Sequence, residues 1–327
     1  MATIKQIAGM VGVSSAAVSR VLNYDESISV SAETRKAIFE TAEKLGYQKK
    51  VIYPRIENIV LLYWITSVDE LENVYYQSIK EELKKQAKKT KVQLSVITKE
   101  EGLGAVPHDT QGFLAIGWFS KAELEQLYKI CRKGVFIDSS PDEKLFDTVR
   151  PNLDSFVTQM VDYFVDKGYR SIGFIGGYDR NIYTGRQVMD VREWSFRQSA
   201  KYYGLLNESY IFIADQYTVT DGYKTAQEMI KKGEIPAAVC VASDTLAVGV
   251  LQALNEAGIQ IPEEVAVFSI NDINVARYVS PPLTTFHIDI PMLCETAIDL
   301  LRDRVLNKGK ITRAVFINGL PVFRKSC

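Results

Sequence analysis

The stretch IKQIAGMVGVSSAAVSRVLN, residues 4–23, predicts two short helices joined by a tight turn. Apolar residues recur at helical spacing in its first half, and Gly12 follows them, where the end of a helix favours a residue that tolerates positive φ. Ser14 can then cap a second helix, whose apolar side carries Val18 and Val21. This pattern is typical of a helix-turn-helix, whose second helix can enter the major groove of DNA.

The outward face of the second predicted helix suits a close approach to DNA. Its residues are Ser15, Ala16, Ser19 and Arg20, of which only the arginine is large. An arginine can bind guanine O6 and N7 with two hydrogen bonds, and a serine can reach phosphate or base edges. The alternative is a helix pair without DNA-binding function that exposes a hydrated polar face.

A third helix is predicted over residues 31–47, because Ser31 can cap it and apolar residues recur up to Leu45 before Gly46 ends it. Residues 1–50 carry seven basic and five acidic side chains, a net charge of +2, whereas the whole chain has a net charge of −1. A mildly basic three-helix head on an acidic remainder favours contact with phosphates.

Three segments of this head resemble the DNA-binding domain of the LacI/GalR family of bacterial repressors: TIKQIA at residues 3–8, VSRVLN at residues 18–23 and EKLGY at residues 43–47. The resemblance implies a homodimer that binds a near-palindromic double-stranded DNA operator, and it implies that the residues after Val13 choose that operator. With the basic linker included, the predicted DNA contacts are Thr3, Ser14, Ser15, Ala16, Ser19, Arg20, Asn23, Lys49 and Lys50.

Residues 49–57 are expected to form a hinge or linker. Its lysines favour phosphate contact, and Pro54 favours an extended backbone. Many members of the family have a hinge helix here, with an alanine-rich arginine pattern and a leucine that wedges into the minor groove. This sequence departs from that pattern, so the hinge helix stays an open question, with Val51 or Ile52 as the candidate wedge.

The 327 residues are enough for the head and two further lobes, and a hydrophobic content of 46% supports sizeable cores. No apolar run approaches the roughly 20 residues that a membrane span needs, and the N-terminus lacks the apolar region of a signal peptide. We therefore expect a cytoplasmic protein without membrane contact. The four cysteines have no metal-ligand spacing, so we expect free thiols, and neither a metal nor a cofactor is predicted.

From residue 58 onward, predicted strands and helices alternate. Strands that are buried between helices indicate parallel sheets covered on both faces, and hence an α/β fold. The family resemblance adds a two-lobed core like that of periplasmic binding proteins, with three crossings of the chain between the lobes. On that basis the domains are the head at residues 1–48, the linker, and a core at residues 58–327, with a first lobe of about residues 58–150 and 285–312 and a second lobe of about residues 151–284 and 313–327.

Several polar residues directly follow predicted strands, where ligand-binding clefts open in α/β sheets. A sugar needs paired donors and acceptors for its hydroxyl groups and an aromatic face for its apolar side. The competing role for each polar side chain is a helix cap or a loop hydrogen bond, and for Ser243 and Asp272 that role is at least as well supported. The residues expected to bind an effector are Trp64, Tyr75, Tyr76, Asp138, Arg192, Ser243, Asn271 and Phe286.

Two segments also resemble one branch of the family. Residues 242–249 (ASDTLAVG) carry Ser243 where the family mostly has asparagine, and residues 269–272 (SIND) carry Asn271 where it mostly has aspartate. The segment PPLTT at residues 281–285 matches the family's turn unchanged. The combination resembles the galactose- and β-galactoside-responsive branch, which implies galactose or a galactoside as the effector.

These features predict a sugar-responsive repressor of a carbohydrate-utilisation operon that a sugar releases from its operator. A co-repressor-dependent regulator or an activator of the same family is the alternative. No enzyme is expected, because the two histidines, His108 and His287, have no metal or triad spacing, and Gly176-Gly177 is not a nucleotide-binding motif. A sugar-binding transport protein would share the core fold, but the DNA-binding head argues against it.

Overall fold

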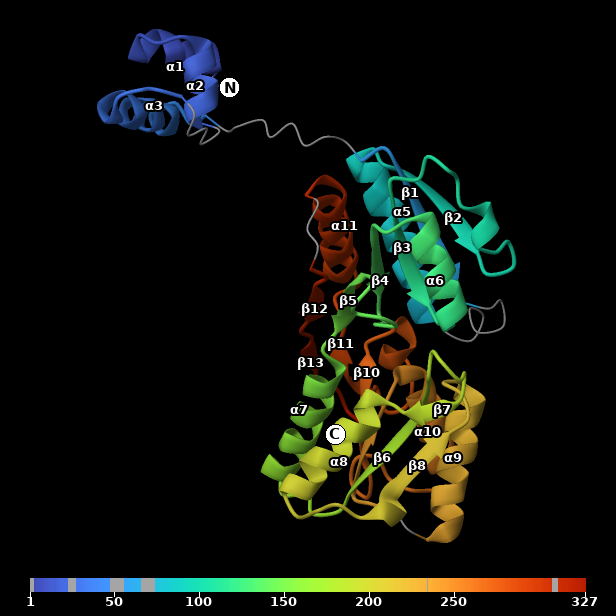
Figure 1. The fold of residues 1–327 in the computed structure, drawn as a ribbon. Coiled ribbons are helices and arrows are strands. Elements are labelled where there is room, and N and C mark those ends of the chain that lie inside the picture. The colour runs from blue at the N-terminus through green and yellow to red at the C-terminus, as the bar shows by residue number, and fades with distance from the viewer. Residues whose placement is uncertain (1–2, 23–27, 48–55, 66–73, 234, 308–310) are drawn as a thin grey trace. The chain divides into compact units, whose positions relative to one another are not determined.

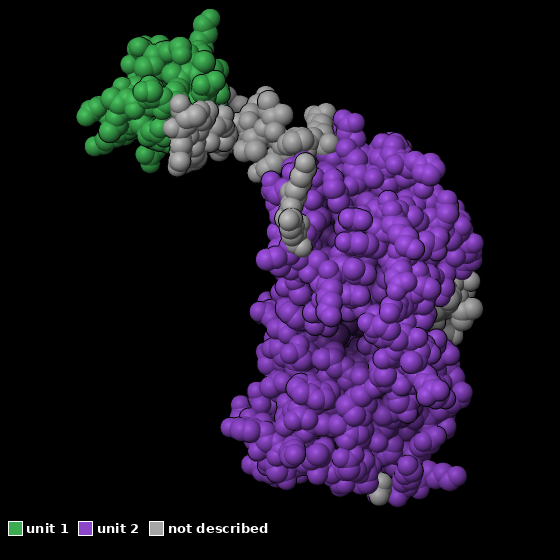
Figure 2. Space-filling model, viewed as in Figure 1, with its two compact units in different colours: residues 1–55 green, residues 56–327 purple. Residues whose placement is uncertain are grey.

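A computed structural model describes residues 3–22, 28–47, 56–65, 74–233, 235–307 and 311–327. The chain forms two compact units, residues 1–55 and residues 56–327, which Figure 2 colours separately. Most of the linker lies outside the described residues. So do three predicted DNA contacts, Asn23, Lys49 and Lys50, and the two candidate wedge residues, Val51 and Ile52.

The smaller unit contains three packed helices, α1 (Ile4–Val11), α2 (Ser15–Leu22) and α3 (Ala32–Lys44) (Figure 1). The predicted turn between α1 and α2 is present, and Gly12 ends α1 with a φ of 75°. All three helices contribute apolar residues at helical spacing to one core, which consists of Ile7, Ala8, Val18, Val21, Ile38 and Ala42. The predicted helix-turn-helix head is therefore confirmed.

The first lobe of the larger unit contains a six-stranded parallel sheet in the order β12-β5-β4-β3-β1-β2. Alternate residues of β1 face different covering layers: Leu61 packs in the cluster with helices α5 and α11, and Leu62 packs in the cluster with α6. The strands are β1 (Asn58–Trp64), β2 (Gln93–Thr98), β3 (Gly112–Gly117), β4 (Gly134–Ile137), β5 (Asp147–Pro151) and β12 (Ala314–Ile317), and the helices are α5 (Val74–Thr90), α6 (Lys121–Ile130) and α11 (Ile290–Leu306).

The second lobe contains a seven-stranded sheet in the order β13-β11-β10-β9-β6-β7, with β8 also paired to β6. Strands β7 and β13 are antiparallel to their neighbours, and the other pairs are parallel. In Figure 1, α7 and α8 lie on one side of this sheet and α9 and α10 on the other. The strands are β6 (Ile172–Arg180), β7 (Gln187–Met189), β8 (Ile211–Ala214), β9 (Ala238–Val241), β10 (Ala266–Asn271), β11 (Thr284–His287) and β13 (Leu320–Val322), and the helices are α7 (Leu153–Asp166), α8 (Val191–Tyr202), α9 (Val219–Lys232) and α10 (Asp244–Glu256).

The chain passes between the two lobes three times, after β5, after β11 and after β12. The first and third crossings lie side by side, because the Asn152 amide donates to the Ile317 carbonyl at 2.9 Å and the side chains of Asn152 and Asn318 are 2.8 Å apart. The predicted lobe boundaries need correction here. Strand β11 belongs to the second-lobe sheet, so the return to the first lobe follows His287, and β12 pairs with β5, so the last crossing follows Ile317.

The predicted α/β class with parallel sheets is confirmed by both lobes. All four cysteines are free, as the sequence predicts. Within the described ranges, no helix combines the length and the hydropathy that a membrane crossing requires. Short 3-10 turns occupy Leu103–Ala105, Glu208–Tyr210 and Asn274–Arg277.

Candidate functional site

The predicted DNA-reading face of α2 is open to solvent. Ser15, Ala16 and Arg20 are exposed and Ser19 is half-buried, whereas Val18 lies in the core of the head. The face therefore carries small side chains and one long cation, so that base edges could approach the helix closely.

Hydroxyl groups fix the beginnings of both helices of this motif. The Ser14 hydroxyl accepts a hydrogen bond from the Ala17 amide at 3.1 Å, and Thr3 forms a reciprocal capping box with Gln6 at the start of α1. Both Ser14 and Thr3 are exposed, so each hydroxyl caps a helix at a point that a phosphate could also reach.

In the larger unit, the first lobe brings Tyr75, Tyr76 and Asp138 together. The Tyr75 hydroxyl donates to the Asp138 carboxylate at 2.7 Å, and Tyr76 is also hydrogen-bonded to it. Asp138 follows β4 with a φ of 68°, a left-handed conformation that is costly for a residue other than glycine. A residue with a strained backbone, whose carboxylate is held in place by two phenols, is typical of a functional position.

The second lobe contributes a guanidinium in a fixed orientation. Arg192 pairs with Asp190 through Nε and Nη2, which lie 2.8 and 2.7 Å from the two carboxylate oxygens. Nη2 also donates to the Tyr217 hydroxyl at 2.7 Å, and Nη1 donates to the Ala242 carbonyl at 2.9 Å. An arginine has five N–H donors, so these contacts among the described residues leave one Nη1 hydrogen for a ligand. Only 15% of the Arg192 side chain is exposed, and the group is thus preorganised.

The charges of the two lobes act on one another. Burial raises the pKa of Asp138, and the positive charge of Arg192 partly opposes that rise. Burial by itself would also raise the pKa of Asp190, but the charge and hydrogen bonds of Arg192 outweigh it and hold that pKa below its usual value. Burial raises the pKa of the Tyr76 phenol, which interacts with both Asp138 and Arg192. Four of the predicted effector residues therefore surround one site between the lobes, which we call the interlobe site.

Sequence reasoning missed Asp190 and Tyr217. Asp190 caps α8 and stands two residues before Arg192, a spacing that could have suggested a local ion pair at the helix start. Tyr217 lies before α9 outside any periodic pattern, and no sequence signal connected it with an arginine 25 residues away. Its ring lies 4.6 Å from the guanidinium, which gives the site a cation–π contact as well as a hydroxyl.

Ser243 and Asp244, which follow β9, serve the fold at the edge of this site. The Ser243 hydroxyl accepts a hydrogen bond from the Leu246 amide at 3.3 Å and so caps α10. The structure therefore shows Ser243 in the role of a helix cap, which was the alternative to effector binding. Asp244 is fully buried and accepts hydrogen bonds from the hydroxyls of Ser269 and Thr285 and from the Ile273 amide. Burial raises the pKa of Asp244 to about 7.

Asn271 ends β10 in a left-handed conformation with a φ of 123°, and Asp272 follows with a φ of 54°. The Asp272 carboxylate accepts a hydrogen bond from Arg324 and lies 3.1 Å from Nδ1 of His287, which fixes the strained turn. Asp272 thus makes loop hydrogen bonds, the structural role that competed with effector binding. Asn271 is held at the carboxyl end of a parallel strand, the edge at which open α/β sheets bind ligands.

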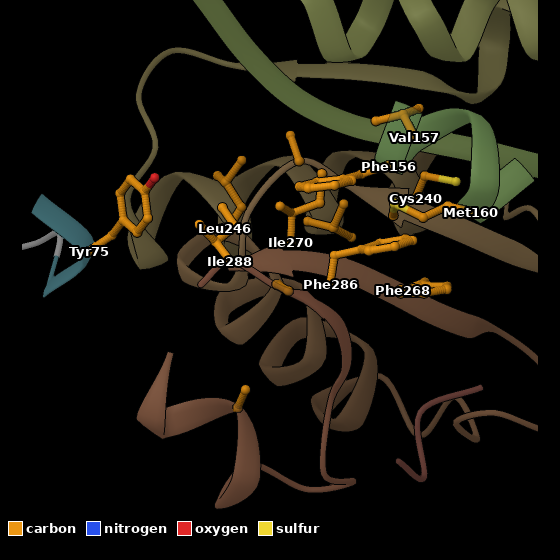
Figure 3. Packing of buried hydrophobic residues seen from close by; sticks show 14 of the residues in the cluster. Tyr75, Phe156, Val157, Met160, Cys240, Leu246, Phe268, Ile270, Phe286 and Ile288 are labelled. Atoms are coloured by element: carbon orange, nitrogen blue, oxygen red, sulfur yellow. The ribbon is translucent and has the colours of Figure 1, made fainter. Parts of the chain in front are cut away.

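The structure does not support Trp64 and Phe286 as effector contacts, because both rings lie in hydrophobic cores. Trp64 is 4% exposed, stacks on Phe119 with ring centres 4.8 Å apart and donates its indole N–H to Glu123. Phe286 is 1% exposed and stacks on Phe156 at 4.8 Å, within the packing that Figure 3 shows. Both belong to strands whose faces are covered by helices, and these two predictions are corrected.

Comparison with known proteins places this arrangement in context. Residues 3–50 match the model of the bacterial regulatory proteins of the lacI family, and residues 161–327 match a periplasmic binding protein-like domain. The chain is 45% identical to the HTH-type transcriptional regulator GanR of Bacillus subtilis (strain 168), over 100% of this chain and 99% of that protein. It is 36% identical to the HTH-type transcriptional regulator LacR of Lactobacillus helveticus, over 100% and 98% of the two chains.

Solved structures agree in fold. The lac repressor dimer bound to operator and the anti-inducer ONPF aligns with a TM-score of 0.70 and 18% identity, over 99% of this chain and 98% of that chain. A complex of the transcriptional regulator CelR with cellobiose aligns with a TM-score of 0.71 and 21% identity over the full length of both chains.

Proposed function

The chain belongs to the LacI family of bacterial DNA-binding transcriptional regulators, and we propose that it represses a carbohydrate-utilisation operon in the cytoplasm until a sugar releases it from its operator. Two heads of a homodimer would bind the half-sites of a near-palindromic DNA through the exposed face of α2. The proposed contacts within the described residues are Thr3, Ser14, Ser15, Ala16, Ser19 and Arg20.

The observation that carries the effector proposal is the pairing of two polar groups across the interlobe site. One lobe supplies the Asp138 carboxylate with its two phenols, and the other supplies the Arg192 guanidinium with Asp190 and Tyr217. The site thus holds two carboxylates against one cation, which disfavours an anionic ligand. Closely spaced donors and acceptors beside aromatic rings suit the hydroxyl groups and C–H faces of a neutral sugar.

Release follows from differential binding to two lobe arrangements. A sugar that contacts Asp138 and Arg192 together stabilises the arrangement in which the two groups are close. A coupling of about 1–3 kcal/mol between the interlobe site and the heads would change operator affinity roughly 5- to 150-fold. The head has its own core, so an effector can alter the placement of the heads without altering their fold.

Galactose or a galactoside is the proposed effector. Asn271 and the spare Nη1 hydrogen of Arg192 are candidate partners for the axial 4-hydroxyl of galactose. A site built to pair with a hydroxyl group rejects an analogue that places the group elsewhere, because its own polar groups are left unpaired.

Calorimetric titration with galactose, lactose, glucose and ribose tests this choice, with operator release followed by fluorescence anisotropy on labelled DNA. We expect binding of galactose or lactose, operator release by the same sugar, and loss of both in Asn271→Ala but not in Asn274→Ala, which alters an exposed asparagine nearby. Tight binding of ribose with none of galactose or lactose would refute the galactoside.

The alternative is a regulator for which the sugar is a co-repressor or an activating ligand. The sign of the anisotropy change decides between the two, because a co-repressor tightens operator binding whereas an inducer weakens it.

A further inference from the structure

A β-hairpin rises from the second-lobe sheet at the side of the interlobe site. Strands β6 and β7 pair from Tyr178 with Met189 to Arg180 with Gln187, and Figure 1 shows the hairpin extending toward α6 of the first lobe. Its loop is internally ordered, because the Asn181 side-chain oxygen accepts hydrogen bonds from two loop amides at 2.9 and 3.0 Å. Residues 178–189, here called the hairpin, therefore form a preorganised arm.

The tip of the hairpin is hydrogen-bonded to the first lobe. The Ile182 carbonyl accepts a hydrogen bond from the Lys121 amide at 3.0 Å. The Arg180 carbonyl accepts a second from the indole N–H of Trp118 at 3.3 Å. Both donors belong to the segment that leads from β3 into α6, so the hairpin connects the two lobes at a place where the chain does not cross between them.

Apolar and cationic contacts accompany these hydrogen bonds. Ile182 is half-buried against the first-lobe cluster that contains Phe119 and Leu124. The Lys121 ammonium lies 4.9 Å from the centre of the Tyr183 ring. The tip of the hairpin is thus seated on the first lobe by its backbone, one aliphatic side chain and one aromatic ring.

The Lys121 amide is a donor that α6 does not need for its own folding. Lys121 is the first residue of α6, and a helix leaves its first four N–H groups without partners of its own. Ser120 and Glu123 already form a capping box at this end. If the lobes separated, water would replace the Ile182 carbonyl, so this hydrogen bond belongs to the closed lobe arrangement and not to the stability of either lobe.

The base of the hairpin adjoins the interlobe site. Met189 is followed directly by Asp190, which holds Arg192. At the other strand, Asp179 lies close enough to Asp190 and Arg192 for their charges to act on its carboxylate, whose pKa burial raises. A displacement of the hairpin would therefore also move Asp190 and Asp179 relative to the Arg192 guanidinium.

We propose that the hairpin is a latch that holds the lobes closed over the interlobe site and so sets the affinity of the effector. The ligand in this proposal rests on the proposed function, but the latch itself does not. Because binding requires the closed arrangement, weakening the latch lowers the closed population and raises the apparent dissociation constant in proportion.

The backbone hydrogen bond can be removed by itself. Proline is favoured at the first position of a helix, and Ser120 is extended with a ψ of 159°, as a residue before proline should be. Lys121→Pro therefore removes the N–H that donates to the Ile182 carbonyl and leaves α6 intact. Lys121→Ala is the matched control, since it loses the same ammonium but keeps the amide.

The first measurement uses lactose and galactose as probes in calorimetry on the full chain. We expect Lys121→Pro to bind the sugar about fivefold to tenfold more weakly than Lys121→Ala, which corresponds to one lost hydrogen bond. A second pair avoids any change in α6: Ile182→Ala, which empties the apolar seat, should also weaken binding, whereas Gln187→Ala on the exposed face of the same hairpin should not.

The second measurement needs no ligand. Trp118 is one of three tryptophans, and opening of the latch would expose its indole N–H to water, so the emission of Lys121→Pro should shift to the red of that of Lys121→Ala. The difference should vanish in the Trp118→Phe background. Equal emission and equal sugar affinity of the two Lys121 variants would overturn the latch. A red shift without binding of either sugar by the wild type would leave the latch standing and overturn the galactoside.

Discussion

The head and the larger unit carry their proposed functional residues in opposite ways. The proposed DNA-reading face of α2 consists of side chains within a few residues of one another, and it points away from the core of the head. The interlobe site joins Tyr75, Asp138 and Arg192 from distant parts of the chain, and its charges are largely buried and paired. An exposed site can change without loss of stability, whereas a buried ionic site cannot, because removal of one partner leaves the other charge without compensation.

The largest effect is expected from Arg192→Ala. It should abolish the sugar response and lower the free energy of unfolding of the larger unit by about 3–5 kcal/mol, since Asp190 would be left buried without its partner. Urea unfolding and operator titration with and without sugar measure the two losses. Lys84→Ala on α5 is the control and should lose little of either, because both Lys84 and its partner Glu81 are exposed. A stable Arg192→Ala protein would contradict the link between site and fold.

Arg20→Ala should show the reverse behaviour. Loss of a base contact should weaken operator binding by about 2 kcal/mol, roughly 30-fold, while the melting temperature stays nearly unchanged. Anisotropy on labelled operator and thermal unfolding provide the comparison, with Lys36→Ala on α3 as a control that removes an exposed cation of the same unit. If Arg20→Ala lowers the melting temperature by several degrees instead, Arg20 supports the fold of the head.

The buried Asp244 makes the stability of the larger unit depend on pH. The pKa of Asp244 is about 7 in the folded chain, against an ordinary value of 3.8. Between pH 3.8 and pH 7, the carboxyl group is therefore protonated in the folded state and ionised in the unfolded state. Stability from this group is therefore greatest in acid and falls as the pH rises toward 7, by about 1 kcal/mol per pH unit.

Urea midpoints from pH 5 to pH 8 measure this fall for the wild type and for Asp244→Asn, which should be flatter. Asp215→Asn, at an exposed position, should follow the wild type. A wild-type curve no steeper than that of Asp244→Asn would refute the assignment.

The smallest expected effects concern two glycines of α1. Gly12 has a φ of 75° with nothing near its missing Cβ, so Gly12→Ala should destabilise the head by about 1 kcal/mol through backbone strain alone. Gly9 is helical and equally uncrowded, so Gly9→Ala should stabilise the head by about 0.5–1 kcal/mol. Neither change should move the unfolding of the larger unit in calorimetry, and two shifts of the same sign would contradict the conformational argument.

Sequence patterns predicted the head almost completely, because helix caps and apolar spacing are local signals: Ser14, Gly12 and Val18 all occupy the expected positions. In the larger unit the same reasoning located strands such as β1, β3 and β9, but it did not predict β5, β7, β11, β12 and β13. These five strands have only three to five residues, and all of them except β12 contain polar residues or proline, so they lack the longer apolar run on which the prediction of a strand depends.

The interlobe site was predicted in part for a similar reason. Position after a strand indicated Asp138, and the family pattern indicated Arg192. Tyr217 could not be found, because its contact with Arg192 arises only when α8 and the segment before α9 pack beside the same strand ends. Phe286 was assigned to the ligand because its apolar ring suits a sugar face, yet stacking on Phe156 uses that same ring in the core.

The interleaving of the lobes also determines the order in which the protein can be completed during translation. Strand β12 closes the edge of the first sheet and β13 that of the second, and both are synthesised after every other strand. At ribosomal speeds of about 5–20 residues per second, the head can fold roughly tens of seconds earlier, since its core is complete by Ala42. A nascent chain can thus carry a folded DNA-reading head while both sheets of its sensor still lack an edge strand.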